Sequence, residues 1–261
     1  MFEFITYGTE KLQIFLLISL RAAGMFITSP VIGHKSIPTM IKAGLAIMLA
    51  IILVPMVSQM ELPVIDSVWM LGAIAIKETA IGAIIGLFFS ILFNAVRMSG
   101  NIVGYQIGLL VAQVMDPESN SQVSMVGEFL YVLALLIFLA IDGHHAILTA
   151  FSDSYQMIPV GIFNFQGSAG DMLIKFTAYA FTIAVKLAAP VMITLFLVTV
   201  SLGVIARTVP QMNIFIVGLP LKIGIGFLVL AAALPVFRFM IEKMTYFFDS
   251  QMAGILYSIG T

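Results

Sequence analysis

The chain has 261 residues, of which 61% are hydrophobic and only 10% are charged, whereas an ordinary soluble domain has about 25% charged residues. This composition is that of an integral membrane protein. The net charge is −1, so the chain has no basic field to hold a phosphate backbone, and no nucleic acid is expected among its partners. No cysteine is present, which excludes disulfides, thiolate metal sites and cysteine nucleophiles.

Six apolar stretches are long enough to cross a hydrocarbon layer, which requires about 20 residues. They cover approximately residues 12–33, 43–60, 67–96, 129–152, 172–206 and 208–237. Backbone groups in lipid must be bonded internally, and the stretches lack the alternation of barrel strands, so they are predicted to be helices. The fold class is therefore all-α and polytopic, with a single membrane-embedded domain over residues 1–261.

Two further features of the sequence concern the first stretch and the last two stretches. Glu3 and Glu10 precede the first basic residue, Lys11, so we expect the first stretch to be retained and not cleaved as a leader. The last two stretches exceed one crossing and contain several prolines, which remove backbone donors and kink helices. These prolines are Pro190, Pro210, Pro220 and Pro235. Broken or hairpin helices are predicted there.

Several charged side chains lie within or beside the apolar stretches, where a charge costs several kcal/mol unless it is paired or hydrated. The candidates for buried charge are Arg21, Lys77, Glu78, Arg97 and Lys222. A proton relay would show several carboxylates along one helix face, so ion pairs between subunits, snorkelling or a water-filled interior are favoured. Lys77 and Glu78 point about 100° apart on a helix, and each is expected to pair elsewhere. Because no partner within the chain is evident, we predict that the chain is stable mainly inside a hetero-oligomer.

No motif for catalysis or cofactor binding is present. The sequence Asp142-Gly143-His144-His145 contains potential metal ligands, but adjacent histidines diverge on a helix and no HExxH spacing occurs. We predict a turn at the membrane interface there, with no metal. Walker A, GxSxG and dinucleotide motifs are also missing. The chain is therefore predicted not to be an enzyme, and no cofactor is expected.

Three glycines at intervals of four line one face of a predicted helix, beside polar amides. They are Gly100, Gly104 and Gly108, with Gln106 between the last two. Small residues on one face let another helix approach backbone to backbone, so this face is predicted to be a subunit contact. A second glycine pair, Gly82 and Gly86, has the GxxxG spacing, which is common by chance in apolar helices and carries less weight.

The glycine helix belongs to a longer segment, residues 98–128, that is too hydrophilic for lipid. The residue before a proline leaves the α conformation, so the helix should stop by Met115, before Asp116-Pro117. Asp as N-cap with Pro at the first helical position then favours a new helix start. The predicted arrangement is a small-residue helix, a break and a polar re-entry, which must line protein or water.

Together these features resemble the R-subunit family of the export gates in bacterial type III secretion, known as FliR in the flagellar system. The resemblance covers essentially the whole chain and depends on the order and spacing of its pieces. The matching pieces are Arg21-x-x-Gly24 leading to Pro30, Gly100-x-x-x-Gly104-x-Gln106-x-Gly108 with Asp116-Pro117, Asp142-Gly143-His144, Ser154 leading to Ile158-Pro159-x-Gly161, and Pro210-Gln211-Met212-Asn213-x-Phe215-x-x-Gly218-x-Pro220-x-Lys222.

The resemblance implies a structural and gating subunit in the bacterial inner membrane, at the flagellar basal body. It would join P and Q subunits (FliP and FliQ), and an associated B subunit (FlhB), in a gate that passes unfolded flagellar proteins. In that family a loop of the R subunit plugs the conduit, and by position the plug would be residues 111–121. Its candidate residues are Val111, Gln113, Val114, Met115, Asp116 and Pro117. The tip has no aromatic residue, so Met115 would have to form the seal.

Two other functions remain open. A secondary transporter for a small solute would also have broken helices and buried charge, but such folds commonly show inverted repeats, and no matching halves are found. The equivalent subunit of a virulence-type secretion system would have the same motifs as the flagellar one.

Overall fold

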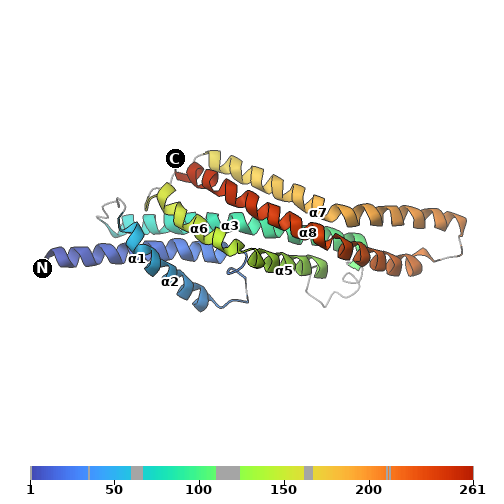
Figure 1. The fold of residues 1–261 in the computed structure, drawn as a ribbon, viewed down its shortest axis with the longest axis horizontal. Coiled ribbons are helices and arrows are strands. Elements are labelled where there is room, and N and C mark those ends of the chain that lie inside the picture. The colour runs from blue at the N-terminus through green and yellow to red at the C-terminus, as the bar shows by residue number, and fades with distance from the viewer. Residues whose placement is uncertain are drawn as a thin grey trace. The chain divides into compact units, whose positions relative to one another are not determined.

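The computed structural model describes residues 2–34, 36–59, 67–109, 124–161, 167–209, 211 and 213–260. All regular structure within these residues is helical (Figure 1). The helices are α1 (Phe2–Thr28), α2 (Thr39–Val57), α3 (Val68–Ile107), α5 (Met125–Ala140), α6 (Gly143–Met157), α7 (Gly167–Thr208) and α8 (Ile214–Gly260). The predicted all-α class is confirmed.

Five of the helices, α1, α2, α3, α7 and α8, are long and apolar enough to cross a membrane, and α5 with α6 forms a bent sixth candidate. The chain is therefore a multi-pass membrane protein. The six predicted stretches correspond to these candidates, although α3 and α8 extend well beyond the stretches that predicted them.

Of the two predicted alternatives for the last stretches, broken or hairpin helices, a break does not occur at Pro190, Pro220 or Pro235. Pro190 lies inside α7, and Pro220 and Pro235 lie inside α8, without ending either helix. A proline removes one backbone donor and bends the axis. Helices of 42 and 47 residues continue through such a site because the remaining backbone bonds on both sides are intact.

The break lies instead in a stretch without proline. Residues 129–152 were predicted as one crossing, but α5 and α6 meet there at a bend of 72°. Asp142 has φ 57°, in the left-handed region, and is the N-cap position of α6. Asp is among the few residues that tolerate this conformation, so the turn predicted at Asp142 is confirmed.

The described chain divides into two compact units, and each is discontinuous in sequence. The first comprises Met1–Ile91, Asp142–Phe176 and Thr245–Thr261, and the second comprises Leu92–Ile141 and Thr177–Met244. Neither unit is a continuous segment that a cut in one linker would release. That residues 1–261 form a single domain stays a prediction.

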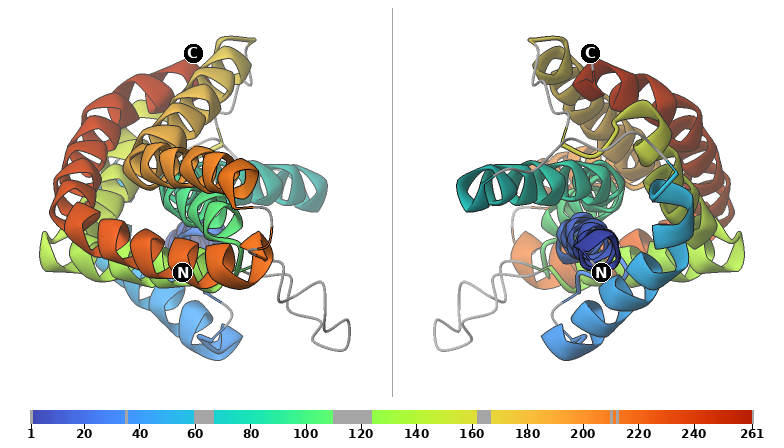
Figure 2. Two further views of the ribbon diagram at one scale, coloured as in Figure 1. Left: turned by 90° about the vertical axis from the view of Figure 1, so that its right-hand side faces the viewer. Right: turned by 90° about the vertical axis from the view of Figure 1, so that its left-hand side faces the viewer.

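In the first unit, α1 packs closely against the first part of α3. A Cβ atom added at Gly24 or Gly82 would meet backbone atoms of the opposite helix. Figure 2 shows α1 almost end-on, with the teal start of α3 beside it. Phe176 fills the space nearby through edge contacts with Phe88 and Phe248, at ring-centroid distances of 4.9 and 5.1 Å. Close-packed glycines and aromatic rings thus contribute to the core of this unit, together with buried aliphatic side chains such as Leu17 and Ile18.

In the second unit, the last part of α3 packs against α5, and α7 runs antiparallel to α8 (Figure 1). Phe93 of α3 makes an edge contact with Phe138 of α5 at 5.1 Å between ring centroids. A Cβ atom at Gly226 of α8 would lie 3.4 Å from Leu195 of α7. The predicted hairpin of the last two stretches is therefore present.

Candidate functional site

A fully buried ion pair joins α1 to α3 in the first unit. Arg21 Nε donates to Glu78 Oε2 at 2.6 Å, and both side chains have no exposed surface. Burying two charges is costly, and the pair is tolerated only when the remaining donors and lone pairs are also satisfied.

The end of α6 supplies those further partners. Arg21 donates to Ser154 Oγ at 3.0 Å and to the carbonyl of Ile158 at 3.1 Å, while the amide of Gly161 donates to Glu78 Oε1 at 2.9 Å. Gly161 has φ 84°, a conformation that favours glycine. The guanidinium also stacks on the ring of Tyr155, 4.0 Å from its centroid. Three distant segments therefore meet at one buried charge cluster.

The expectation that these charges have no partner within the chain is wrong for Arg21 and Glu78. They are 57 residues apart in sequence, and nothing in the local pattern indicates that α1 and α3 are neighbours. Lys77 is half-buried and makes no ion pair with another described residue. It therefore does not share the cluster of Glu78, as the 100° helical offset predicts.

A second ion pair joins α3 to α5 in the second unit. Arg97 lies 3.2 Å from Glu128 Oε2 and stacks 4.0 Å from the ring centroid of Tyr131. Both charged side chains keep about a third of their surface, at 35% and 39% exposed. Arg97 Nε is buried and has no hydrogen-bond partner among the described residues. The charge of Arg97 is therefore also paired within the chain, against expectation.

The glycine face of α3 meets a helix of its own chain. A Cβ atom at Gly100 would lie 2.5 Å from Gly127 Cα, and one at Gly104 would lie 2.6 Å from Ser124 Oγ, both in the α5 region. The close backbone approach predicted by the spacing is present, but α5 provides it. Contact of this face with another subunit stays a prediction.

Gly108 has a different role from the other two glycines. It has φ 92° and follows the last residue of α3, so it ends the helix and does not extend its face. Left-handed glycine is the common helix C-terminal cap. Gln106 lies half-buried in the last turn of α3, and Lys222 lies half-buried on α8. The six plug candidates between Val111 and Pro117 lie outside the described residues.

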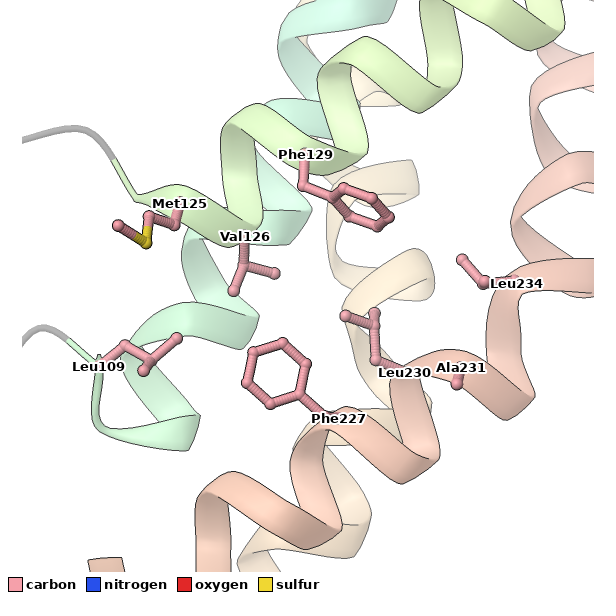
Figure 3. Close-up of a pocket in the computed structure, with 8 residues that line it drawn as sticks. All are labelled: Leu109, Met125, Val126, Phe129, Phe227, Leu230, Ala231 and Leu234. Carbon is pink, nitrogen blue, oxygen red and sulfur yellow. The ribbon is translucent and has the colours of Figure 1, made fainter. Parts of the chain in front are cut away.

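An apolar groove of about 400 Å³ lies in the second unit, between the end of α3, the start of α5 and the middle of α8 (Figure 3). Its lining residues are Leu109, Met125, Val126, Phe129, Phe227, Leu230, Ala231 and Leu234. All eight side chains are apolar, so this groove has no group to recognise a polar or charged solute. That lining does not favour a transporter of such solutes.

The turn between α5 and α6 brings three potential metal ligands together. Asp142, His144 and His145 each place one ligand atom within 4.8 Å of the others. The Asp142 and His145 side chains are 73% and 67% exposed, and their 3.9 Å contact is that of a surface pair. The absence of a metal at this turn stays a prediction.

Sequence reasoning missed the residues that complete the buried cluster, Ser154, Tyr155, Ile158 and Gly161. Ser154, Ile158 and Gly161 stand in the pieces that matched the family, but their chemistry could not be assigned without knowing that they face Arg21. Gly82 and Gly86, which seemed weak as a motif, both pack against α1. Glu78 lies one helical turn before Gly82. A buried charge beside the glycine pair was therefore the signal in the sequence that could have pointed to this packed face.

Comparisons with known proteins match most of the chain, and they agree on its family. The model of the family "Bacterial export proteins, family 1" matches residues 12–248. The chain is 34% identical to the flagellar biosynthetic protein FliR of Bacillus subtilis (strain 168) over 250 residues, covering 94% of this chain and 95% of the relative.

Two more distant relatives carry the same name. The FliR proteins of Aquifex aeolicus (strain VF5) and Escherichia coli (strain K12) are 31% and 30% identical, covering 87% and 83% of this chain and 88% and 82% of the relatives. These names denote export and flagellar biosynthesis and not a class of enzyme. The chain therefore belongs to family 1 of the bacterial export proteins, whose relatives here are flagellar biosynthetic proteins.

Proposed function

We propose that this protein is a structural and gating subunit of the flagellar type III protein export gate in the bacterial inner membrane. With P and Q subunits, and an associated B subunit, it forms the conduit for unfolded flagellar proteins. The observation that carries this proposal is the family match over residues 12–248, together with flagellar relatives that align over more than four fifths of both chains.

The distribution of buried surface supports a subunit that works inside an assembly. Within an apolar window of 18 residues in each helix, buried residues make up 56% in α3, but only 17% in α2 and 22% in α7 and α8. Large apolar side chains such as Trp69 and Phe239 are 90% and 63% exposed. Surface of this kind needs lipid or partner proteins to cover it.

Co-purification with the P and Q subunits tests the assembly role. The chain and both partners would be expressed together, extracted in mild detergent and isolated through a tag on this chain. A stable complex containing all three is expected. A chain that purifies alone as a monodisperse monomer, equally resistant to protease with and without P and Q, would instead favour a transporter.

The flagellar role is tested by motility. A strain lacking this gene should fail to swim and should recover when the chain is supplied on a plasmid. The flagellar names of the relatives favour this outcome over a virulence-type system. A motile deletion strain with impaired secretion of virulence proteins would contradict it.

For gating, we propose residues 111–121 as the segment that seals the resting conduit. An open conduit wide enough for a polypeptide would also pass ions, so the gate requires a removable block. Irregular backbone at membrane depth is tolerated only against protein or water. The sequence predicts such backbone here, from Asp116-Pro117 and its polar neighbours.

A short Gly-Ser linker in place of residues 111–121 tests the seal. Sodium or proton entry into cells that express the mutant gate should rise, while pull-down with P and Q stays at the wild-type level. A normally assembled mutant that remains as ion-tight as wild type would exclude this segment as the seal.

A further inference from the structure

Lys77 is a cation without a partner inside an apolar part of α3. Its side chain is half-buried, and its ammonium makes no hydrogen bond or ion pair with another described residue but keeps access to the protein surface. The flanking residues 68–76 and 80–89 contain no charged side chain. At about 1.5 Å per residue, Lys77 lies about 14 Å along the helix from the start of α3. A charge within such a stretch is costly unless it is paired or hydrated.

The neighbouring carboxylate is not available to Lys77. Both oxygens of Glu78 are engaged, one by Arg21 Nε and the other by the amide of Gly161, and its side chain points about 100° away from Lys77 on the helix. The glutamates of α5 and α8 are likewise paired with arginines. These pairs are Glu128 with Arg97 and Glu242 with Arg238. The charge of Lys77 is therefore not neutralised by any carboxylate that the structure describes.

The face of α3 around Lys77 has the composition of a helix contact. Trp69, Ala73, Lys77, Ala80 and Ile84 follow one another at intervals of four and three residues, so they lie on one face. Trp69 and Ala73 are exposed, and the other three are half-buried. Small residues let a second membrane helix approach closely, and tryptophan is enriched among the anchors of protein interfaces. A helix can therefore pack on the two alanines, with its own side chains beside the ammonium.

We propose that this face of α3 binds a membrane helix of a neighbouring subunit, and that Lys77 pairs with a carboxylate on that helix. The proposal rests on the export-gate function, which supplies the neighbouring subunits. Ionisable side chains within membrane helices pair with one another, and the unneutralised positive charge requires an acidic partner. Lipid phosphate is the other source of negative charge, but alanines on both sides of Lys77 favour a helix over lipid.

Carbodiimide cross-linking tests the contact directly, because it joins a lysine amine to a carboxylate only when the two groups touch. The full chain would be co-expressed with the P, Q and B subunits, extracted in mild detergent and isolated as a complex. Dicyclohexylcarbodiimide, which enters apolar surroundings, takes up the water that is released as the amide forms. Mass spectrometry should find an amide between Lys77 and an aspartate or glutamate of another subunit.

The variant Lys77→Arg is the control for the chemistry of the cross-link. It keeps the positive charge, so the complex should form at the wild-type level. The guanidinium group is not coupled by carbodiimide, so the cross-link should disappear. A cross-linked product that persists in Lys77→Arg would come from another lysine and would not support the contact.

The variant Lys77→Met measures how much the charge contributes to assembly. The amount of co-purified partner should fall by roughly tenfold or more, as is typical when one member of an interfacial charge pair is removed. The unfolding midpoint of the isolated chain should not fall, because the ammonium makes no contact within the described chain. Lys243→Met removes an exposed lysine of α8 and should leave co-purification unchanged.

The outcomes separate this contact from the export-gate function. A wild-type chain that binds none of the P, Q and B subunits would refute that function, and this contact with it. An intact wild-type complex without a cross-link from Lys77 to another subunit would refute this contact alone, and so would a cross-link from Lys77 to a carboxylate of its own chain. Loss of bound anionic phospholipid in Lys77→Met, with partner levels unchanged, would identify lipid phosphate as the partner and overturn the proposal.

Discussion

The crossing of α1 with α3 and the crossing of α3 with α5 contain the same types of residue in different environments. Each combines closely packed glycines with an arginine that pairs with a glutamate and stacks 4.0 Å from a tyrosine ring. At the first crossing the ion pair is 2.6 Å long and has no exposed surface. At the second it is 3.2 Å long, and both side chains keep about a third of their surface.

The difference arises from a third segment. The end of α6 adds two acceptors for Arg21 and one donor for Glu78, and it excludes solvent from the pair. Among the described residues, no third segment makes contacts of this kind with the pair of Arg97 and Glu128, and solvent can reach both charges. Identical side-chain chemistry can therefore be a fixed part of a core or a weak surface interaction, depending on what covers it.

The largest expected effect is the loss of one charge from the buried pair. Arg21→Met leaves the Glu78 carboxylate buried with the Gly161 amide as its one remaining partner among the described residues. Removing one member of a buried pair typically costs about 3 to 5 kcal/mol. Urea unfolding of the detergent-solubilised protein, or its level in membranes, should reveal this loss.

The double variant Arg21→Met with Glu78→Leu controls for packing. Replacing both charges by apolar side chains is often neutral or even stabilising, so much of the loss should be recovered. If the double variant were as unstable as Arg21→Met, the unpaired charge would not be the cause.

An intermediate effect is expected where glycines bring backbones together. Gly82→Ala would place a Cβ atom against the backbone carbonyl of Arg21, and overpacking of this kind costs about 1 to 3 kcal/mol. Gly72→Ala, also in α3 but in open space, is the matched control and should gain stability through helix propensity. Equal unfolding midpoints for both variants would refute a close α1–α3 contact.

The same comparison applies at the second crossing. Gly100→Ala would lie 2.5 Å from Gly127 Cα, whereas a Cβ atom at Gly224 meets nothing within 4 Å. We expect Gly100→Ala to destabilise the isolated chain by about 1 to 3 kcal/mol and Gly224→Ala to have no such effect. A Gly100→Ala chain that is fully stable alone but fails to bind P and Q would place the contact in the assembly and not in α5.

The smallest effect is expected for the exposed pair. Arg97→Met should cost about 1 kcal/mol or less, as for other exposed ion pairs, and the difference from wild type should shrink in 1 M salt because screening weakens it. The cost of Arg21→Met should be insensitive to the same salt. A salt-independent loss of several kcal/mol at Arg97 would mean that its environment is as dry as that of Arg21.

Local patterns were sufficient to predict the helices but not their neighbours. Apolar length identified the membrane helices, and the Asp142-Gly143 turn was recognised from its residues. Proline was a poor guide to helix ends, since α7 and α8 continue through Pro190, Pro220 and Pro235. The pairing of Arg21 with Glu78 depends on which helices pack together, and that information is carried by the whole fold.

The buried cluster also has a consequence for the order of biosynthesis. The ribosome makes Arg21 and Glu78 long before Gly161, and at about 5 to 20 residues per second the delay between Glu78 and Gly161 is on the order of 4 to 17 seconds. During that interval the nascent helices carry two charges, and the segment at the end of α6 that supplies their other hydrogen-bond partners has not yet been fully translated. A chaperone or insertase that shields this site would act within that interval, before α6 emerges.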